Sequence, residues 1–174
     1  MISIISGTNR PLSNSMIVAN TYKNLLEQQG EDAQVLNLEE LPSEFMYSAS
    51  YGKKDNRFEA IVQQFVTGAS KFIFVVPEYN GSFPGVLKSF LDCISPKLWH
   101  DKKSAIIGLS AGRAGNLRGM DHLTGILHYL QVEVYSKKPK LSQFDKLADL
   151  EKRTITDEET LALIEKHISK FLKF

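Results

Sequence analysis

The sequence predicts a doubly wound α/β sandwich that forms a single domain over residues 1–174. Two observations carry this prediction: short Ile- and Val-rich runs alternate with helix-like segments, and the central runs are continuously apolar. Continuous apolar runs are expected when helices cover both faces of a parallel sheet. The predicted strands are residues 2–5, 34–38, 72–76, 104–109 and 132–135.

The intervening segments carry apolar residues at helical spacing. In the first of them, Met16, Ala19 and Tyr22 recur on one face, and Gly30 follows as a stop signal. The last begins with an expected capping box, in which Thr156 caps the helix and Glu159 lies three residues later. The predicted helices are 15–29, 57–69, 84–94, 116–129 and 157–174. This alternation implies right-handed crossovers and helices in two layers.

Residues 39–56 carry the weakest pattern. They read as a long loop in which Phe45, Met46, Tyr47 and Tyr51 stand among small and polar residues. Such a loop either binds a partner or folds its aromatic side chains onto its own body. Residues 45–51 are the candidate segment for such a partner contact.

Composition limits the classes of partner and the cellular setting. Lys and Arg total 21 against 20 for Asp and Glu, so the net charge of +1 gives no long-range field for nucleic acid or an anionic membrane. No apolar stretch approaches the roughly 20 residues that span a bilayer, and no basic leader precedes the first strand. The single cysteine, Cys93, excludes an internal disulfide. We therefore expect a soluble, cytoplasmic protein.

Polar residues crowd the loop after the first predicted strand. In an open parallel sheet, ligands bind beyond the carboxyl ends of the strands, at the point where the strand order reverses. Gly7 permits a tight turn, the hydroxyls of Thr8, Ser13 and Ser15 can donate to phosphate oxygens, and Arg10 can add charge. The following helix offers unpaired N–H groups and a positive dipole end. Ser13 or Asn14 could simply cap that helix, which would explain one residue but not the cluster.

The loops after the third and fourth strands complete the candidate site. In the first of these, Tyr79 and Phe83 offer ring faces and Gly81 allows close approach of a flat ligand, although Tyr79 could merely pack at a turn. Residues 110–115, Ser-Ala-Gly-Arg-Ala-Gly, could present backbone N–H groups to carbonyl oxygens at the far edge of such a ring. Neither a dinucleotide fingerprint nor a P-loop motif is present, which favours a monophosphate ligand.

Several remaining residues favour packing over chemistry. Cys93 is expected to be a buried small hydrophobe on the apolar face of its helix. Trp99 is expected to pack. The four histidines lack the spacing of metal ligands, so no metal site is predicted.

The loop sequences resemble those of the NADPH-dependent FMN reductase family, which includes azoreductase-like and chromate-reductase-like quinone reductases. The family's phosphate loop is similar to G-T-N-R-P-L-S-N-S at residues 7–15, where Thr replaces the usual Ser, and its second signature is similar to P-E-Y-N-G-S-F-P-G from residue 77, continuing through Leu87, Lys88 and Asp92. The resemblance implies a flavodoxin-like fold with a five-stranded parallel sheet of order 2-1-3-4-5. It also implies that Thr8, Arg10, Ser13, Asn14 and Ser15 hold the FMN phosphate, that Pro77, Glu78, Tyr79, Asn80 and Gly81 line the isoalloxazine, and that Ser110, Gly112 and Arg113 complete the pocket.

The resemblance further implies an NAD(P)H-dependent FMN reductase that uses NADPH or NADH as cosubstrate. Hydride would pass to bound FMN and then to a quinone-, azo- or metal-type small-molecule acceptor, with no catalytic side chain required. Homodimers or homotetramers are expected. The alternative is a non-enzymatic electron-transfer flavodoxin, which usually needs an acidic docking surface that a net charge of +1 does not provide.

Overall fold

The computed structural model describes residues 1–51 and 55–174 and has the predicted parallel α/β architecture. The strands follow the order β2-β1-β3-β4-β5, as expected, and β6 pairs with the end of β4 beyond β5. Pairs along this path are parallel, and β1 lies between β2 and β3. The strands are β1 (Ile2–Ser6), β2 (Ala33–Asn37), β3 (Lys71–Pro77), β4 (Lys103–Leu109), β5 (Glu133–Val134) and β6 (Lys140–Leu141).

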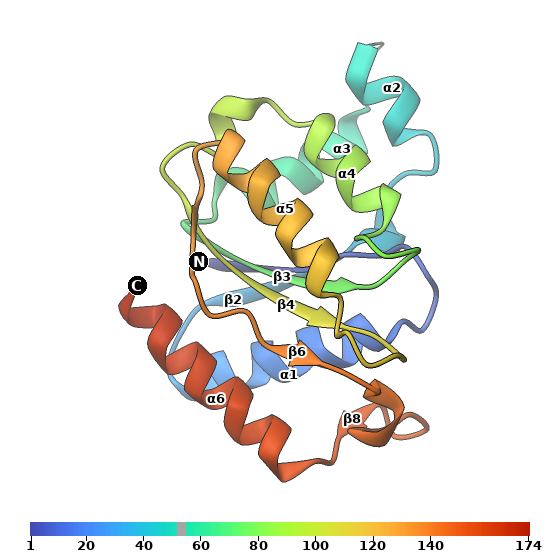
Figure 1. The fold of residues 1–174 in the computed structure, drawn as a ribbon. Coiled ribbons are helices and arrows are strands. Elements are labelled where there is room, and N and C mark those ends of the chain that lie inside the picture. Colours follow the sequence, from blue (N-terminus) through green and yellow to red (C-terminus); the bar gives the residue numbers. More distant parts are fainter. Residues whose placement is uncertain (52–54) are drawn as a thin grey trace.

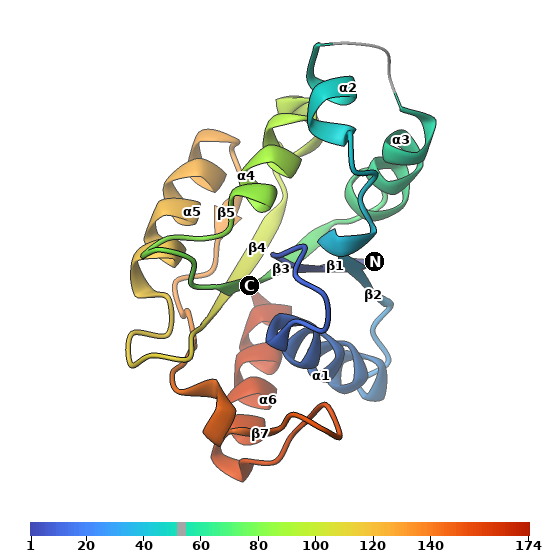
Figure 2. The same ribbon diagram turned by 90° about the vertical axis from the view of Figure 1, so that its right-hand side faces the viewer.

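Helices cover both faces of the sheet (Figures 1 and 2). One layer contains α1 (Asn14–Gln28) and α6 (Glu158–Lys173), and the other contains α3 (Asn56–Val62), α4 (Gly85–Asp92) and α5 (Leu117–Tyr129). Each layer encloses its own apolar cluster. Alternate strand residues supply the two clusters, so that Ile5 and Phe74 face one layer while Ile4 and Val75 face the other.

The predicted loop at 39–56 is wrong in part, because this segment forms η1 (Leu38–Glu40) and the helix α2 (Phe45–Tyr51). Phe45 is buried and stacks on Phe58 of α3 with ring centroids 5.4 Å apart, while Tyr47 is 72% exposed. Burial of one aromatic face stabilises a short helix whose own sequence has little helical periodicity. The side chain of Tyr51 and residues 52–54 lie outside the described part of the chain.

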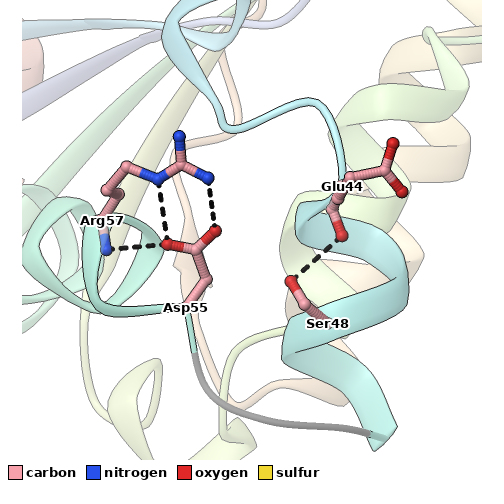
Figure 3. A network of polar contacts seen from close by, with 4 residues as sticks. All are labelled: Glu44, Ser48, Asp55 and Arg57. Carbon is pink, nitrogen blue, oxygen red and sulfur yellow. Dashed lines mark hydrogen bonds and ion pairs between the residues drawn. The ribbon is translucent and has the colours of Figure 1, made fainter.

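Helix α3 begins with a charged cap (Figure 3). Asp55 accepts a hydrogen bond from the backbone N–H of Arg57, and the Arg57 guanidinium donates to both carboxylate oxygens. The hydrogen bonds from the Arg57 side chain lower the pKa of Asp55. In the same view, the Ser48 hydroxyl donates to the backbone carbonyl of Glu44 at the start of α2. The helix predicted at 57–69 therefore consists of two parts. Helix α3 forms the first part, and the π-helical stretch η2 (Gln63–Thr67) follows it directly.

Three local predictions after α3 need correction. The predicted cap Thr156 is wrong: Asp157 caps α6 and accepts from the Thr160 N–H at 2.8 Å, because a carboxylate is the stronger acceptor for the helix end. Cys93 is half-buried at the end of α4 and not fully enclosed. The predicted fifth strand, 132–135, forms only the shorter β5, and an additional strand that was not predicted, β6, pairs with the opposite end of β4.

Other short elements lie outside the main sheet and helices. Residues 142–157, between β6 and α6, contain η4 (Phe144–Lys146) and a two-stranded hairpin of β7 (Ala148–Asp149) and β8 (Thr154–Ile155), which the sequence did not suggest. Trp99, which follows η3 (Pro96–Leu98), is fully buried against Phe72, as expected. In the described ranges, no helix has the length and apolarity needed to cross a bilayer.

A buried polar contact joins α1 to α6. His167 Nε2 lies 3.0 Å from the Lys137 carbonyl, which can only accept, so Nε2 carries the proton and Nδ1 accepts from the Tyr22 hydroxyl at 2.9 Å. Burial lowers the pKa of His167 to about 4 and raises that of Tyr22. Both side chains are therefore neutral in the folded protein near pH 7, and they hold the first and last helices together.

This contact predicts a loss of stability in mild acid. Between pH 6.5, the ordinary pKa of histidine, and about 4, the unfolded chain binds a proton at residue 167 that the folded chain does not. The free energy of unfolding should therefore fall by up to about 3 kcal/mol as pH drops through this window. Urea unfolding at pH 7 and pH 5 measures it. H167Q retains a donor toward the Lys137 carbonyl but cannot titrate, so an unchanged pH dependence in this variant would contradict the assignment.

Candidate functional site

A cavity of about 470 Å³ opens at the carboxyl ends of β1, β3 and β4. It lies where the strand order reverses between β1 and β3, the usual position of a ligand in an open parallel sheet. Three predicted loops and one unpredicted segment form its walls. The lining residues are Thr8, Arg10, Pro11, Leu12, Ser13, Asn14, Ser15, Pro77, Glu78, Tyr79, Leu109, Ser110, Ala111, Phe144, Asp145 and Leu150.

The first loop leaves the sheet in close contact with β3. The Gly7 N–H donates to the Val75 carbonyl at 2.9 Å, and a Cβ at Gly7 would lie 3.1 Å from that oxygen and 3.2 Å from Leu87 Cδ2. A glycine therefore suits this position, since the backbone of the loop runs against the neighbouring strand.

Hydroxyl groups form a connected cluster behind the first loop. Ser15 Oγ lies 2.9 Å from Ser6 Oγ and 3.0 Å from Ser13 Oγ, and all three side chains are buried. Ser13 occupies the N-cap position of α1 without making a side-chain cap, so simple helix capping does not explain this residue. The cluster places several buried hydroxyls beside the cavity wall.

The start of α1 favours an anion. The first N–H groups of a helix have no partner within it and lie at the positive end of the helix dipole. The first turn of α1 contains no acidic residue, and the exposed Arg10 lines the cavity nearby. Asp145 also lines the cavity, with its Oδ1 3.4 Å from Asn14 Nδ2, so the lining carries charges of both signs.

The loop after β3 is a two-residue reversal. Tyr79 and Ser82 exchange backbone hydrogen bonds, and Asn80 and Gly81 both have positive φ, at 51° and 76°. These angles are typical of a type I′ turn, for which Asn-Gly is the preferred pair. Asn80 and Gly81 thus shape the turn and lie outside the cavity lining.

The turn presents Tyr79 to the first loop. The Tyr79 hydroxyl lies 2.9 Å from Thr8 Oγ1, which also accepts from the Arg10 N–H. The Tyr79 side chain is 38% exposed, and Pro77 and Glu78 line the cavity with it. This wall therefore offers a partly open aromatic ring beside the hydroxyl cluster.

In the loop after β4, the Ser110 hydroxyl donates to the Gly112 carbonyl and accepts from the Gly115 N–H, both at 2.9 Å. Ser110 and Ala111 line the cavity, whereas Gly112 and the exposed Arg113 do not. The predicted third wall therefore forms, but with a smaller contribution from this loop than expected.

Asn116, at the start of α5, anchors the site from behind. Its side-chain Nδ2 donates to the carbonyls of Val76 and Pro77 at 3.0 Å each, and its backbone N–H donates to Glu78 Oε2 at 3.3 Å. Asn116 has a positive φ of 61°, a conformation that asparagine tolerates better than most residues. One side chain thus fixes the end of β3, and it was not among the predicted site residues.

Three further lining residues come from the segment after β6: Phe144, Asp145 and Leu150. No local motif marks them, because they reach the cavity through tertiary folding. Hydrophobic Phe144 is fully buried, while Asp145 and Leu150 are exposed at the rim.

The lining fits a ligand that has one phosphate and a flat ring. Buried hydroxyls and the start of α1, which has no acidic residue in its first turn, suit the phosphate. The partly exposed ring of Tyr79 suits a flat ring. The strand order, the two helical layers and this cavity at the switch point define the class of flavodoxin-like flavoproteins.

Comparison with known proteins identifies the family. The profile of the NADPH-dependent FMN reductase family matches residues 1–145, and the chain belongs to this family of flavin-dependent oxidoreductases. A 2-hydroxy-1,4-benzoquinone reductase from Burkholderia sp. is 29% identical over 130 residues, which are 72% of this chain and 71% of that protein. An NAD(P)H-dependent FMN reductase from Pseudomonas aeruginosa is 34% identical over 100 residues, covering 56% and 52%.

A solved structure agrees with the fold. FerB, a flavoenzyme NAD(P)H:(acceptor) oxidoreductase from Paracoccus denitrificans, superimposes with a TM-score of 0.78 at 20% identity, covering 99% of this chain and 94% of that chain. The predicted flavodoxin-like fold, enzyme class and use of FMN with NAD(P)H are thereby confirmed.

The anchoring role of Asn116 gives a second prediction. N116A removes both hydrogen bonds to the end of β3 and forces alanine into a positive φ, so it should lower the free energy of unfolding by about 2–4 kcal/mol. Urea unfolding of the full chain measures the change. Asn24 is exposed on α1 and provides the control, since N24A should alter stability by less than about 0.5 kcal/mol. Equal effects of the two substitutions would contradict this account.

Proposed function

We propose that the cavity binds FMN with its phosphate at residues 8–15 and its isoalloxazine against residues 77–79, and that the enzyme reduces a quinone-type acceptor with NAD(P)H. The observation that carries this proposal is the juxtaposition in one cavity of the buried hydroxyls of Ser13 and Ser15, the acid-free start of α1 and the partly open ring of Tyr79. FMN combines a dianionic phosphate with a flat aromatic ring system, which matches these features.

The chain's residues divide the work of binding. Thr8, Ser13 and Ser15 supply hydroxyl donors, the start of α1 supplies N–H groups, and Arg10 supplies charge for the phosphate. Pro77 and Tyr79 offer apolar surface to the ring, while Glu78 is held in place by the Asn116 N–H. Asn80, Gly81 and Gly112 contribute by shaping their loops. Contact of Arg113 with the flavin stays a prediction.

No side chain needs to transfer a proton in this scheme. Bound FMN would supply the redox chemistry, accepting hydride from the nicotinamide and passing electrons to the second substrate. The residues of the cavity hold the ring in a fixed position and leave one face accessible. This role requires no catalytic acid–base pair among the residues that line the cavity.

A quinone-type acceptor is supported by the relatives. The Burkholderia protein that aligns with 72% of this chain is a 2-hydroxy-1,4-benzoquinone reductase, and a plant relative from Oryza sativa is described as a probable NADPH:quinone oxidoreductase. A small planar quinone is also the right shape to stack on an exposed flavin face. We further propose a cytoplasmic homodimer or homotetramer, in which the exposed Tyr47 on α2 contacts the partner subunit.

The phosphate assignment predicts a selective loss of affinity. S15A removes a hydroxyl from the buried cluster and should weaken FMN binding about 10- to 150-fold, as expected for one lost hydrogen bond to a charged group. Riboflavin, which lacks the phosphate, should bind the variant and the wild type about equally. Titration by quenching of flavin fluorescence measures both affinities. An equal loss for the two flavins would place the phosphate elsewhere.

The proposed enzymatic function predicts that the purified chain oxidises NAD(P)H without any protein partner. The purified chain should show flavin absorbance that bleaches on addition of NADPH or NADH, and a benzoquinone should restore it with continuous consumption of the nicotinamide. Initial rates at varied concentrations of both substrates should give parallel double-reciprocal lines, because the substrates use one site in turn. Bleaching that requires an added reductase protein would favour the electron-transfer flavodoxin alternative. A protein that binds no FMN would refute the proposal.

A further inference from the structure

The segment between β6 and α6 spans the cavity from one wall to the other. We name residues 142–155 the clasp; they comprise η4, β7 and β8 and the turns between them. The family match ends at residue 145, so most of the clasp lies beyond it. Figure 2 shows the clasp, in orange to red, beneath α1 and close to the start of α6.

One end of the clasp is hydrogen-bonded to the loop after β4. The N–H groups of Gln143 and Phe144 donate to the carbonyls of Gly112 and Ser110, at 2.8 and 3.1 Å. The Ser142 hydroxyl donates to the Arg113 carbonyl of the same loop at 2.8 Å. This end is therefore fixed to the wall that the fourth strand supplies.

The other end holds the first loop through Arg153. Its guanidinium donates from Nη1 to the Leu12 carbonyl at 2.9 Å and from Nη2 to the Ser13 carbonyl at 2.8 Å. These are two successive carbonyls directly before α1, and no ion pair of Arg153 is recorded within the described residues. The planar guanidinium is suited to this fork, since it presents two parallel donors and retains its charge.

The first loop needs such support. Leu12 has a φ of 51°, which costs an ordinary L-residue about 1–2 kcal/mol, and its side chain is 78% exposed. Packing of the Leu12 side chain therefore does little to hold this conformation. The two bonds from Arg153 lie on the carbonyls of this residue and the next, and they fix the direction in which the loop enters α1.

We propose that Arg153 is a positioning residue for the phosphate of FMN. It holds Ser13 so that the Ser13 and Ser15 hydroxyls and the first N–H groups of α1 converge on one point of the cavity wall. The proposal rests on the proposed FMN site, and it adds a determinant that lies outside the family's matched region.

The test compares two flavins that differ only by the phosphate. R153Q should weaken FMN binding by about tenfold or more, equivalent to about 1.4 kcal/mol, in titrations of the flavin-stripped full chain. Riboflavin affinity should change by less than about twofold, because the ring wall is not touched. R153K, which retains the charge but has a single donor centre, should fall between the wild type and R153Q.

Lys152 provides a matched control in the same hairpin. Its ammonium pairs with Asp149 at 3.2 Å and its side chain is 79% exposed, so K152Q removes one positive charge without touching the first loop. This variant should bind both flavins as the wild type does. Thermal unfolding of each flavin-stripped variant shows whether it is folded. If R153Q is not folded, R153K replaces it in the comparison of the two flavins.

The outcomes separate this proposal from the proposed function. If the wild type binds FMN and R153Q binds it with the same affinity, the role of Arg153 is overturned but the FMN site is left intact. An equal loss of FMN and riboflavin affinity in R153Q also overturns it, since the residue would then act on the fold as a whole. A wild-type chain that binds neither flavin refutes the proposed function, and this inference with it.

Discussion

The end of strand β3 is the constraint on which the site depends. Carbonyls at the end of a parallel strand leave the ladder, and a buried carbonyl without a partner costs about 1–3 kcal/mol. Here the Val75 carbonyl is satisfied by the Gly7 N–H, and those of Val76 and Pro77 are satisfied by Asn116 Nδ2. The same hydrogen bonds that complete the backbone pairing therefore fix the first loop and the start of α5 to one strand end, beside which the cavity opens.

Small residues at the strand ends follow from this close approach. A Cβ at Gly108, near the end of β4, would lie 2.1 Å from the Gly115 carbonyl oxygen, a distance that no side chain can occupy. On the far side of Asn116, a Cβ at Gly119 would lie 2.1 Å from its Oδ1. Glycines in this region thus serve packing of backbone and side chains behind the site. Within residues 110–115, which were expected to present N–H groups to a ligand, the Gly115 N–H instead donates to the Ser110 hydroxyl.

The main strands and the two motif loops could be predicted because their signals are local, whereas the strand order came from the resemblance to a family. Apolar runs mark the strands, and Asn80-Gly81 encodes the sharp turn in two residues. Features that depend on distant contacts could not be predicted in this way. Helix α2 forms where Phe45 stacks on Phe58, and the additional strand β6 forms where residues 140–141 pair with the end of β4. Asn116 gives no signal in the sequence that distinguishes it from an ordinary turn residue.

Helix α1 links the local and the distant parts of the molecule. Its start carries the hydroxyls of the first loop, and its middle is joined to α6 by the contact between Tyr22 and His167. Its entry is held by Arg153. His167 and Arg153, which hydrogen-bond to α1 and to the loop before it, both lie after the end of the family match at residue 145. In the proposed FMN site, the motif residues would therefore bind the phosphate in a geometry that the last part of the chain helps to set. Flavin affinity and the docking of α6 would then be coupled, because each orders the same helix and a ligand that binds only the ordered form stabilises the whole domain.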